Sequence, residues 1–258
     1  MTKTLQISNI IALIMTIVMN YLSNTGIFND QTMSTVSASY QNYFTPSGYA
    51  FSIWGFIYLL LIAFVIYQSQ GLFGNGNPPK VVSKIGWLFV LSCLANSAWV
   101  IAWLYDQTAL SVLLMFVLLG SLLAIVLKNR MELDMLSLKH VVLEWWPFAI
   151  YTGWIVAASI ANVAAFLTKI QWDGLGMSDL KWTVIMLCAS GLVYLALIWL
   201  RNLRESAIVG VWALAAIAHA NWDQTPVIAY TALVIAGVLF LNVSIHALQN
   251  QGRHFSKN

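Results

Sequence analysis

The sequence TPSGYAFSIWGFIYLLLIAFVIY, at residues 45–67, contains the feature that decides the fold. A proline and a glycine precede an apolar run that is long enough to cross the roughly 30 Å hydrocarbon core of a bilayer as an α-helix. Trp54 and Tyr58 are four residues apart near its start, so they lie on one helix face. We therefore predict a membrane-spanning helix that presents two aromatic side chains near one end.

The composition of the whole chain extends this prediction. Of its 258 residues, 60% are apolar and only 8% are charged, whereas an average soluble domain is about 25% charged. The sequence therefore predicts an all-α integral membrane protein whose main partner is the lipid bilayer. Because the chain has no basic run with interleaved aromatic residues, nucleic acid is not an expected partner.

Eight segments are apolar and long enough to be candidate transmembrane helices. The third and fourth are separated only by Asp106 and Gln107, which predicts a tight hairpin. The seventh is short and rich in alanine, and is the weakest of the eight. The predicted segments are 5–25, 49–70, 84–105, 107–128, 142–168, 181–201, 206–222 and 226–248.

The distribution of basic residues gives an independent test of this count. With eight spans and the N-terminus inside, ten of the twelve lysines and arginines fall in inner segments, and only Lys169 and Lys181 fall outside. Positive charge collects on the cytoplasmic side of membrane proteins. For a bacterial inner (plasma) membrane, which is the expected location, this distribution places both termini in the cytoplasm and residues 26–48, the lid segment, outside.

Three of the predicted helices place polar or indole side chains at similar depth. The third carries Asn96 and Trp99 on one face, and the fifth carries Trp154, Ala158 and Asn162 on one face. All lie in the outer half of the membrane, where Trp54 of the second helix also falls. Asparagine facing lipid is costly, so these side chains should face inward. They either line a ligand cavity or form structural hydrogen bonds between helices.

Other chemistry is only weakly indicated. Cys93 and Cys188 have no metal-ligand spacing, and we identify neither catalytic residues nor a metal site. A polar cluster at the outer end of the seventh segment is formed by His219, Asn221 and Asp223. It fits a proton or cation site, although a cluster of polar side chains at the membrane–water interface is favoured. Acidic residues deep in the spans, typical of pumps and coupled transporters, are not found. A binding protein is therefore favoured over an enzyme.

Three motifs give the sequence a family resemblance. The second helix reads Pro46-Ser47-Gly48-Tyr49-Ala50-Phe51-Ser52-Ile53-Trp54-Gly55-Phe56-Ile57-Tyr58, the third contains Ala95-Asn96-Ser97-Ala98-Trp99, and the fifth contains Trp154, Ala158 and Asn162 at four-residue spacing. In this order they resemble the tryptophan-rich sensory protein family, also called translocator protein or peripheral benzodiazepine receptor. The family's double proline is replaced by Thr45-Pro46, and Tyr43 stands for its loop tryptophan.

The resemblance implies an organisation in two parts. Residues 1–168 would form a five-helix ligand-binding bundle, and residues 169–258 would add a three-helix extension outside the resemblance. Family members are often dimeric, which implies a homodimer. The lid residues would be Tyr43 and Pro46. The ligand-binding residues would be Trp54, Tyr58, Asn96, Trp99, Trp154, Ala158 and Asn162.

The resemblance also implies a class of ligand. The protein would be a receptor or sensor that binds a flat hydrophobic molecule of the porphyrin, haem or sterol class, with no cofactor required. One alternative is a transporter of a small hydrophobic or anionic compound, in which His219 or Asp223 takes part. The other is a light-dependent porphyrin-degrading enzyme, for which Trp54 and Trp154 are the candidates.

Overall fold

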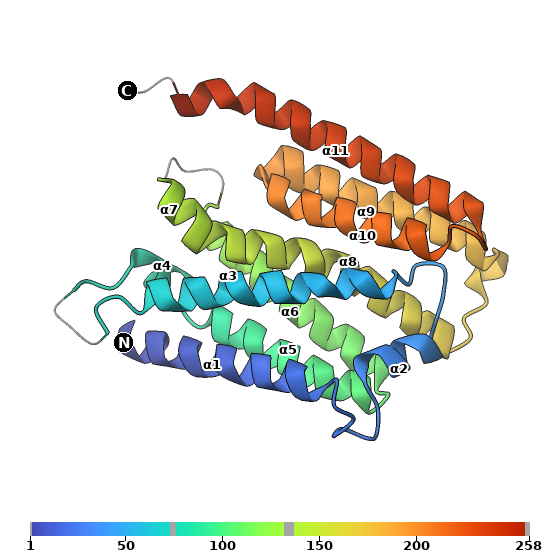
Figure 1. The fold of residues 1–258 in the computed structure, drawn as a ribbon, viewed down its shortest axis with the longest axis horizontal. Coiled ribbons are helices and arrows are strands. Elements are labelled where there is room, and N and C mark those ends of the chain that lie inside the picture. The colour runs from blue at the N-terminus through green and yellow to red at the C-terminus, as the bar shows by residue number, and fades with distance from the viewer. Residues whose placement is uncertain (1, 73–75, 132–136, 256–258) are drawn as a thin grey trace.

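The chain folds into a bundle of helices that run side by side (Figure 1). The computed structural model describes residues 2–72, 76–131 and 137–255. Within them each of the eight predicted segments contains a long helix, so the predicted all-α membrane bundle is confirmed. These helices are α1 (Thr2–Leu22), α3 (Ile53–Gln68), α5 (Leu88–Leu104), α6 (Thr108–Lys128), α8 (Trp146–Lys169), α9 (Asp179–Arg201), α10 (Arg204–Ala220) and α11 (Pro226–Phe255).

Six stretches are long and apolar enough to cross a membrane within the described ranges. They are Thr2–Leu22, Gly48–Gln68, Thr108–Lys128, Leu138–Lys169, Asp179–Arg201 and Pro226–Gln249. The other two long helices, α5 and α10, have 17 residues each. At 1.5 Å per residue, each of these is about 25 Å long and slightly shorter than the hydrocarbon core.

Two of the predicted segments contain or adjoin a break or a change of helix type. The third segment does not begin at residue 84, because Gly86 has a φ of 54° and separates a short helix, α4 (Lys80–Ile85), from α5. A left-handed backbone cannot continue a right-handed helix, and glycine adopts it without steric cost. The fifth segment begins within a π-helical turn, η2 (Val141–Trp145), which follows the short helix α7 (Leu138–His140) and leads directly into α8.

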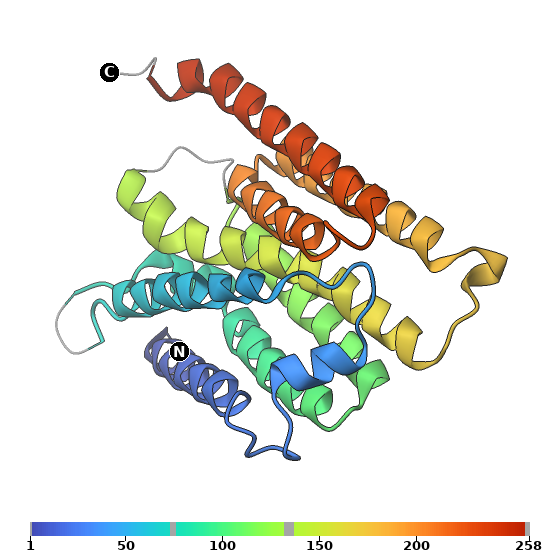
Figure 2. The same cartoon turned by 45° about the vertical axis from the view of Figure 1, so that its right-hand side comes forward.

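Helix α8 lies at the centre of the bundle (Figure 2). Of the span Leu138–Lys169, 67% of the most apolar window is buried inside the protein, against 28–39% for the other five spans. It packs against α3 and α6 on the side of the first helices, and against α9 and α10 on the side of the last. Both parts of the chain therefore share one central helix.

A small-residue contact joins α8 to α10. A Cβ atom added at Gly153 would lie 2.5 Å from the Ser206 carbonyl oxygen, closer than real Cβ contacts. The Ser206 hydroxyl donates to the Ala149 carbonyl at 2.6 Å, and the Tyr194 hydroxyl of α9 donates to the Gly153 carbonyl at 2.7 Å. The close helix approach that small residues allow is thus present at Gly153.

The lid segment crosses one end of the bundle and contains regular structure of its own. It forms α2 (Met33–Ser39), which packs on α5. Thr32 and Thr35 form a reciprocal capping box at the start of α2, and this satisfies backbone N–H groups that would otherwise lack partners. A short 3₁₀ helix, η1 (Gly48–Ser52), then leads into α3, and a second, η3 (Gly174–Gly176), lies between α8 and α9.

Candidate ligand site

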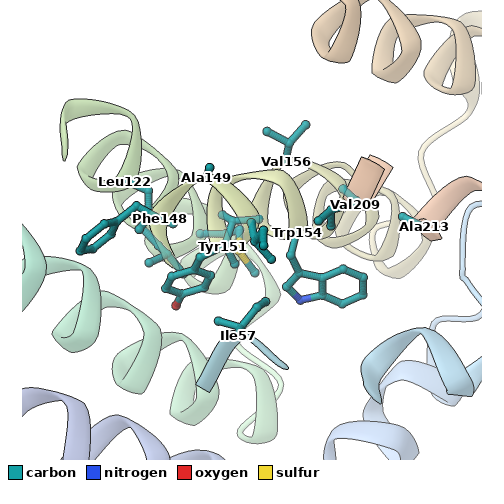
Figure 3. Close-up of a cluster of buried hydrophobic side chains, with 14 of the residues drawn as sticks. Ile57, Leu122, Phe148, Ala149, Tyr151, Trp154, Val156, Val209 and Ala213 are labelled. Atoms are coloured by element: carbon teal, nitrogen blue, oxygen red, sulfur yellow. The ribbon is translucent and has the colours of Figure 1, made fainter. Parts of the chain in front are cut away.

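Aromatic side chains gather where the start of α3 meets α8. The Trp54 ring stacks on Tyr58 with centroids 5.5 Å apart, and meets Tyr151 and Trp154 edge-on at 5.7 and 6.3 Å. Phe51 of η1 meets Trp154 edge-on at 5.9 Å. Figure 3 shows Tyr151 and Trp154 pointing from α8 toward Ile57 of α3. We call Phe51, Trp54, Tyr58, Tyr151 and Trp154 the aromatic cluster.

Two polar atoms of the aromatic cluster are buried without a partner. Within the described residues, neither the Tyr58 hydroxyl oxygen nor Trp154 Nε1 makes a hydrogen bond. Leaving such a group unpaired away from water costs roughly 1–3 kcal/mol. The cluster therefore combines aromatic faces with two unsatisfied hydrogen-bonding groups.

Asn96 joins three helices. Its Oδ1 accepts a hydrogen bond from Asn20 Nδ2 of α1 at 2.7 Å, and its Nδ2 donates to the Tyr151 hydroxyl of α8 at 2.9 Å. The side chain is fully buried. These contacts make Asn96 a hydrogen-bonded link between α1, α5 and α8. Asn20 was not among the predicted site residues.

Trp99 and Asn162 form a second polar group at the junction of α5, α6 and α8. Trp99 Nε1 donates to Asn162 Oδ1 at 3.2 Å, and Asn162 Nδ2 donates to the Ser111 hydroxyl at 2.9 Å. The Trp99 ring stacks on Trp103 at 6.2 Å. Ala158 is half-buried on α8, one turn from both Trp154 and Asn162.

The seven predicted ligand-binding residues thus separate into distinct environments. Trp54, Tyr58 and Trp154 meet in the aromatic cluster, and Asn96 reaches it through Tyr151. Trp99 and Asn162 pair with each other instead. Ligand contact at any of these positions stays a prediction.

The lid residues contact α10, which the sequence interpretation missed. Asn221 Nδ2 donates to the Tyr43 carbonyl at 3.0 Å, and Ser47 N–H, directly after Pro46, donates to the Ala216 carbonyl at 3.1 Å. The Tyr43 side chain is itself exposed, while the neighbouring Phe44 is buried. His219 of α10 also contacts the lid segment, because its Nδ1 lies 2.9 Å from the Ser47 hydroxyl.

An ionic contact holds the other end of the lid segment. The Tyr40 hydroxyl donates to Asp106 Oδ1 at 2.6 Å, and Lys169 Nζ lies 2.7 Å from Asp106 Oδ2. Partial burial acts to raise the pKa of the Asp106 carboxyl, but the hydrogen bonds from Lys169 and Tyr40 outweigh it and hold this pKa below its usual value. This triad connects the lid segment to the α5–α6 turn and to the end of α8.

The described residues contain no group of three or more histidine, cysteine, aspartate and glutamate side chains that could hold a metal ion.

Comparison with known proteins gives one positive finding. A family model described as "TSPO-like protein" matches residues 6–245. This match includes α9 and α10, which the three sequence motifs do not cover. No curated protein and no solved structure matches the chain significantly. Because the family match covers most of the sequence, the chain belongs to the TSPO-like family.

Proposed function

We propose that the protein is a membrane sensor that binds a flat hydrophobic ligand of the porphyrin class at the aromatic cluster. The TSPO-like family suggests a sensing, ligand-binding or transport role in the membrane. The observation that carries the proposal is the pair of unpartnered polar atoms, Tyr58 Oη and Trp154 Nε1, buried among aromatic rings.

The chemistry of a tetrapyrrole matches this surface. Its aromatic plane stacks on indole and phenol rings, or meets them edge-on, and its carboxylates and ring nitrogens include hydrogen-bond acceptors. Both the Tyr58 hydroxyl and the Trp154 indole can donate. A ligand that accepts these bonds removes the cost of two unsatisfied groups at once.

Ligand access is linked to η1, the short helix that follows the lid segment. Phe51 in η1 packs against Trp154, and the same helix is held to α10 by the bond from Trp212 Nε1 to the Ala50 carbonyl, at 3.1 Å. We expect a plate the size of a porphyrin to displace Phe51 when it reaches Trp154. We infer that binding moves η1, and that this movement transmits the ligand signal to α10.

Porphyrin titration of the purified protein tests the proposal. We expect Trp54→Ala to weaken binding of metal-free porphyrin by at least ten-fold, because the stacked ring is lost. Trp199→Ala is the matched control, since Trp199 is exposed on α9 and bonds to Asn242. Equal affinities in Trp54→Ala, Trp199→Ala and the wild type would reject the cluster as the site.

Haem provides a second comparison. The sequence shows no obvious histidine or cysteine to bind iron axially in the outer half of the first five spans, so we expect metal-free porphyrin to bind at least as well as haem. Absorption spectra measured during both titrations check this. Much tighter haem binding with a histidine-type absorption band contradicts the expectation.

A further inference from the structure

Two arginines flank the turn between α9 and α10. Arg201 is the last residue of α9, and Arg204 is the first residue of α10. The turn lies at the same end of the bundle as the N-terminus and α7 (Figure 1), which is the end predicted to face the cytoplasm. Two positive charges are therefore placed close together along the chain where the bundle meets the membrane surface.

The backbone of this turn is well fixed. Asn202 has a left-handed conformation with a φ of 59° and ends α9. Its N–H donates to the Ile198 carbonyl at 2.9 Å, and the Leu203 N–H donates to the Leu197 carbonyl at 3.0 Å. These bonds satisfy carbonyls that the end of a helix leaves without partners, and the Leu203 side chain is fully buried. The two arginines are therefore held on either side of a rigid turn.

One edge of the Arg201 guanidinium is enclosed without a partner. Its Nε and Nη2 atoms are buried, and neither makes a hydrogen bond in the part of the chain that the structure describes. The same holds for Nε of Arg204. Together, Nε and Nη2 form the fork with which an arginine donates two parallel hydrogen bonds to an oxyanion. The unpaired edge of Arg201 therefore has the geometry of an oxyanion-binding group.

The charges around the turn leave Arg201 without a counterion. Glu205 is the acidic residue next in the chain, and its carboxylate lies against Arg204 and Trp146. Among the described residues, no ion pair is formed by Arg201. A partly enclosed charge without an opposite charge is costly, and arginine stays charged under all ordinary conditions. Binding of an anion at Arg201 removes this cost.

Apolar side chains next to Arg201 indicate where such an anion comes from. Trp199 and Leu200 directly precede it and are exposed. Two turns earlier on α9, Leu192 and Val193 are exposed as well. These positions recur with the helical period and form one stripe along α9. In a membrane-spanning protein this stripe contacts lipid chains, and it leads directly to the arginine.

We propose that Arg201 binds the phosphate group of an anionic phospholipid from the leaflet at this end of the bundle. Nε and Nη2 of Arg201 donate to two phosphate oxygens, and Arg204 adds a second positive charge. The acyl chains lie along the exposed stripe of α9. This site is separate from the aromatic cluster and does not depend on the function proposed for it.

Native mass spectrometry of the delipidated full-length protein in detergent tests the proposal. The probe is dioleoylphosphatidylglycerol, and the comparison lipid is dioleoylphosphatidylcholine. Both contain the phosphate, but the choline group brings a positive charge to the two arginines. We expect saturable binding of the phosphatidylglycerol, about ten-fold tighter than that of the phosphatidylcholine. Glycerol phosphate and oleate at the same concentration should not compete, because each lacks one part of the ligand.

Two pairs of variants assign the phosphate contact. Arg201→Lys keeps the charge but loses the planar fork, so the affinity should fall about ten-fold. Arg130→Lys is the matched control, because Arg130 is exposed just after α6 at the same end of the bundle. Arg201→Gln should weaken binding further, whereas Lys128→Gln, which removes one exposed charge at the end of α6, should leave it unchanged.

Four results overturn the proposal. The first is equal affinity of the wild-type protein for the two lipids, a comparison that needs no variant to fold. The second is a loss of affinity in Arg130→Lys or Lys128→Gln as large as in the Arg201 variants, which means general attraction of anionic lipid only. Equal competition by glycerol phosphate assigns the site to soluble phosphates, and equal competition by oleate assigns it to carboxylates.

Discussion

Within the candidate site, the hydroxyl of Tyr58 and the indole N–H of Trp154 are the groups that lack a hydrogen-bond partner. Both are buried in aromatic surroundings without a partner in the described chain. A buried polar group without a hydrogen bond lowers stability, whereas its apolar isostere does not. Removing such a group should therefore have opposite effects on folding and on ligand binding.

Tyr58→Phe tests this expectation. The thermal stability of the ligand-free variant should equal or exceed that of the wild type, because an unpaired hydroxyl is lost. Its affinity for metal-free porphyrin should fall by about five-fold, since one hydrogen bond is worth roughly 1 kcal/mol. Melting temperature and porphyrin titration measure the two effects.

Tyr194→Phe is the control for Tyr58→Phe. In the wild type the Tyr194 hydroxyl donates to the Gly153 carbonyl. We therefore expect Tyr194→Phe to lower the free energy of unfolding by about 1 kcal/mol. If Tyr58→Phe destabilises the empty protein as much as Tyr194→Phe does, the Tyr58 hydroxyl has a partner and the argument fails.

Asn162 is expected to act on stability. Its amide satisfies Trp99 Nε1 and the Ser111 hydroxyl, so Asn162→Leu leaves a buried indole N–H unpaired. We expect the variant to fold with a stability lower by about 1–3 kcal/mol, measured by thermal unfolding in detergent. An unchanged melting temperature together with lost porphyrin binding would show instead that Asn162 contacts the ligand.

At the scale of elements, the contact between α8 and α10 depends on the absence of a side chain at Gly153. A methyl group there meets the backbone of Ser206, and backbone cannot move as a flexible side chain can. Gly153→Ala should therefore lower stability by about 1–3 kcal/mol.

Gly237→Ala is the matched control for Gly153→Ala. Gly237 lies within α11, and an added Cβ meets nothing within 4 Å. Alanine is the better helix former by about 1 kcal/mol, so this variant should be as stable as the wild type or more so. The melting temperatures of Gly153→Ala and Gly237→Ala test this difference. If both variants change the melting temperature equally, close packing at Gly153 is not the explanation.

The lid segment is a second element with a testable attachment. The pKa of Asp106 is lowered in the folded protein, so the contact stabilises the lid at pH values above the unfolded pKa of about 3.9. That stabilisation is lost as the pH falls through the lower, folded pKa. The contact is partly exposed, so salt should also weaken it.

Spin-label mobility on α2 measures this attachment. A label at Ser34→Cys, on the exposed face of α2, should become more mobile as the pH drops below about 4. Asp106→Asn should make it mobile at neutral pH, and Asp223→Asn, in the exposed α10–α11 turn, should not. A label that ignores both pH and Asp106→Asn would show that other contacts hold the lid.

At the scale of the whole molecule, the last three helices complete the structure around α8. Helix α10 supplies the partners of Ala149 and Gly153, and it also holds the lid segment at Ser47 and η1 at Ala50. The aromatic cluster therefore depends on residues from both predicted parts of the chain for its surroundings.

Truncation after Lys169 tests this dependence. The fragment exposes the α8 surface that α10 covers and frees one end of the lid, so we expect it to aggregate or to melt well below the full chain, with weakened porphyrin binding. Size-exclusion chromatography in detergent and porphyrin titration provide the measurements. A monodisperse fragment with full affinity would show that residues 1–168 form an independent ligand-binding domain.

Much of this architecture could be predicted from sequence. Trp54 and Tyr58 were expected on one face and do stack, and a tight hairpin was expected at Asp106 and Gln107, where a short turn joins α5 to α6. The partners of Asn96 and the anchoring of the lid on α10 were not predicted. Each depends on how one helix is rotated against another, which neither spacing nor hydropathy specifies.

The sequence by itself determined that the chain is an all-helical membrane protein and where its long helices lie. The reason is that a chain of this composition must satisfy its backbone hydrogen bonds within each apolar segment. Only the tertiary structure decided which faces meet. Lipid tails are as apolar as the protein core, so a helix face toward lipid and one toward protein look alike in sequence. For that reason the close contact between Gly153 of α8 and Ser206 of α10 emerged only in the folded bundle.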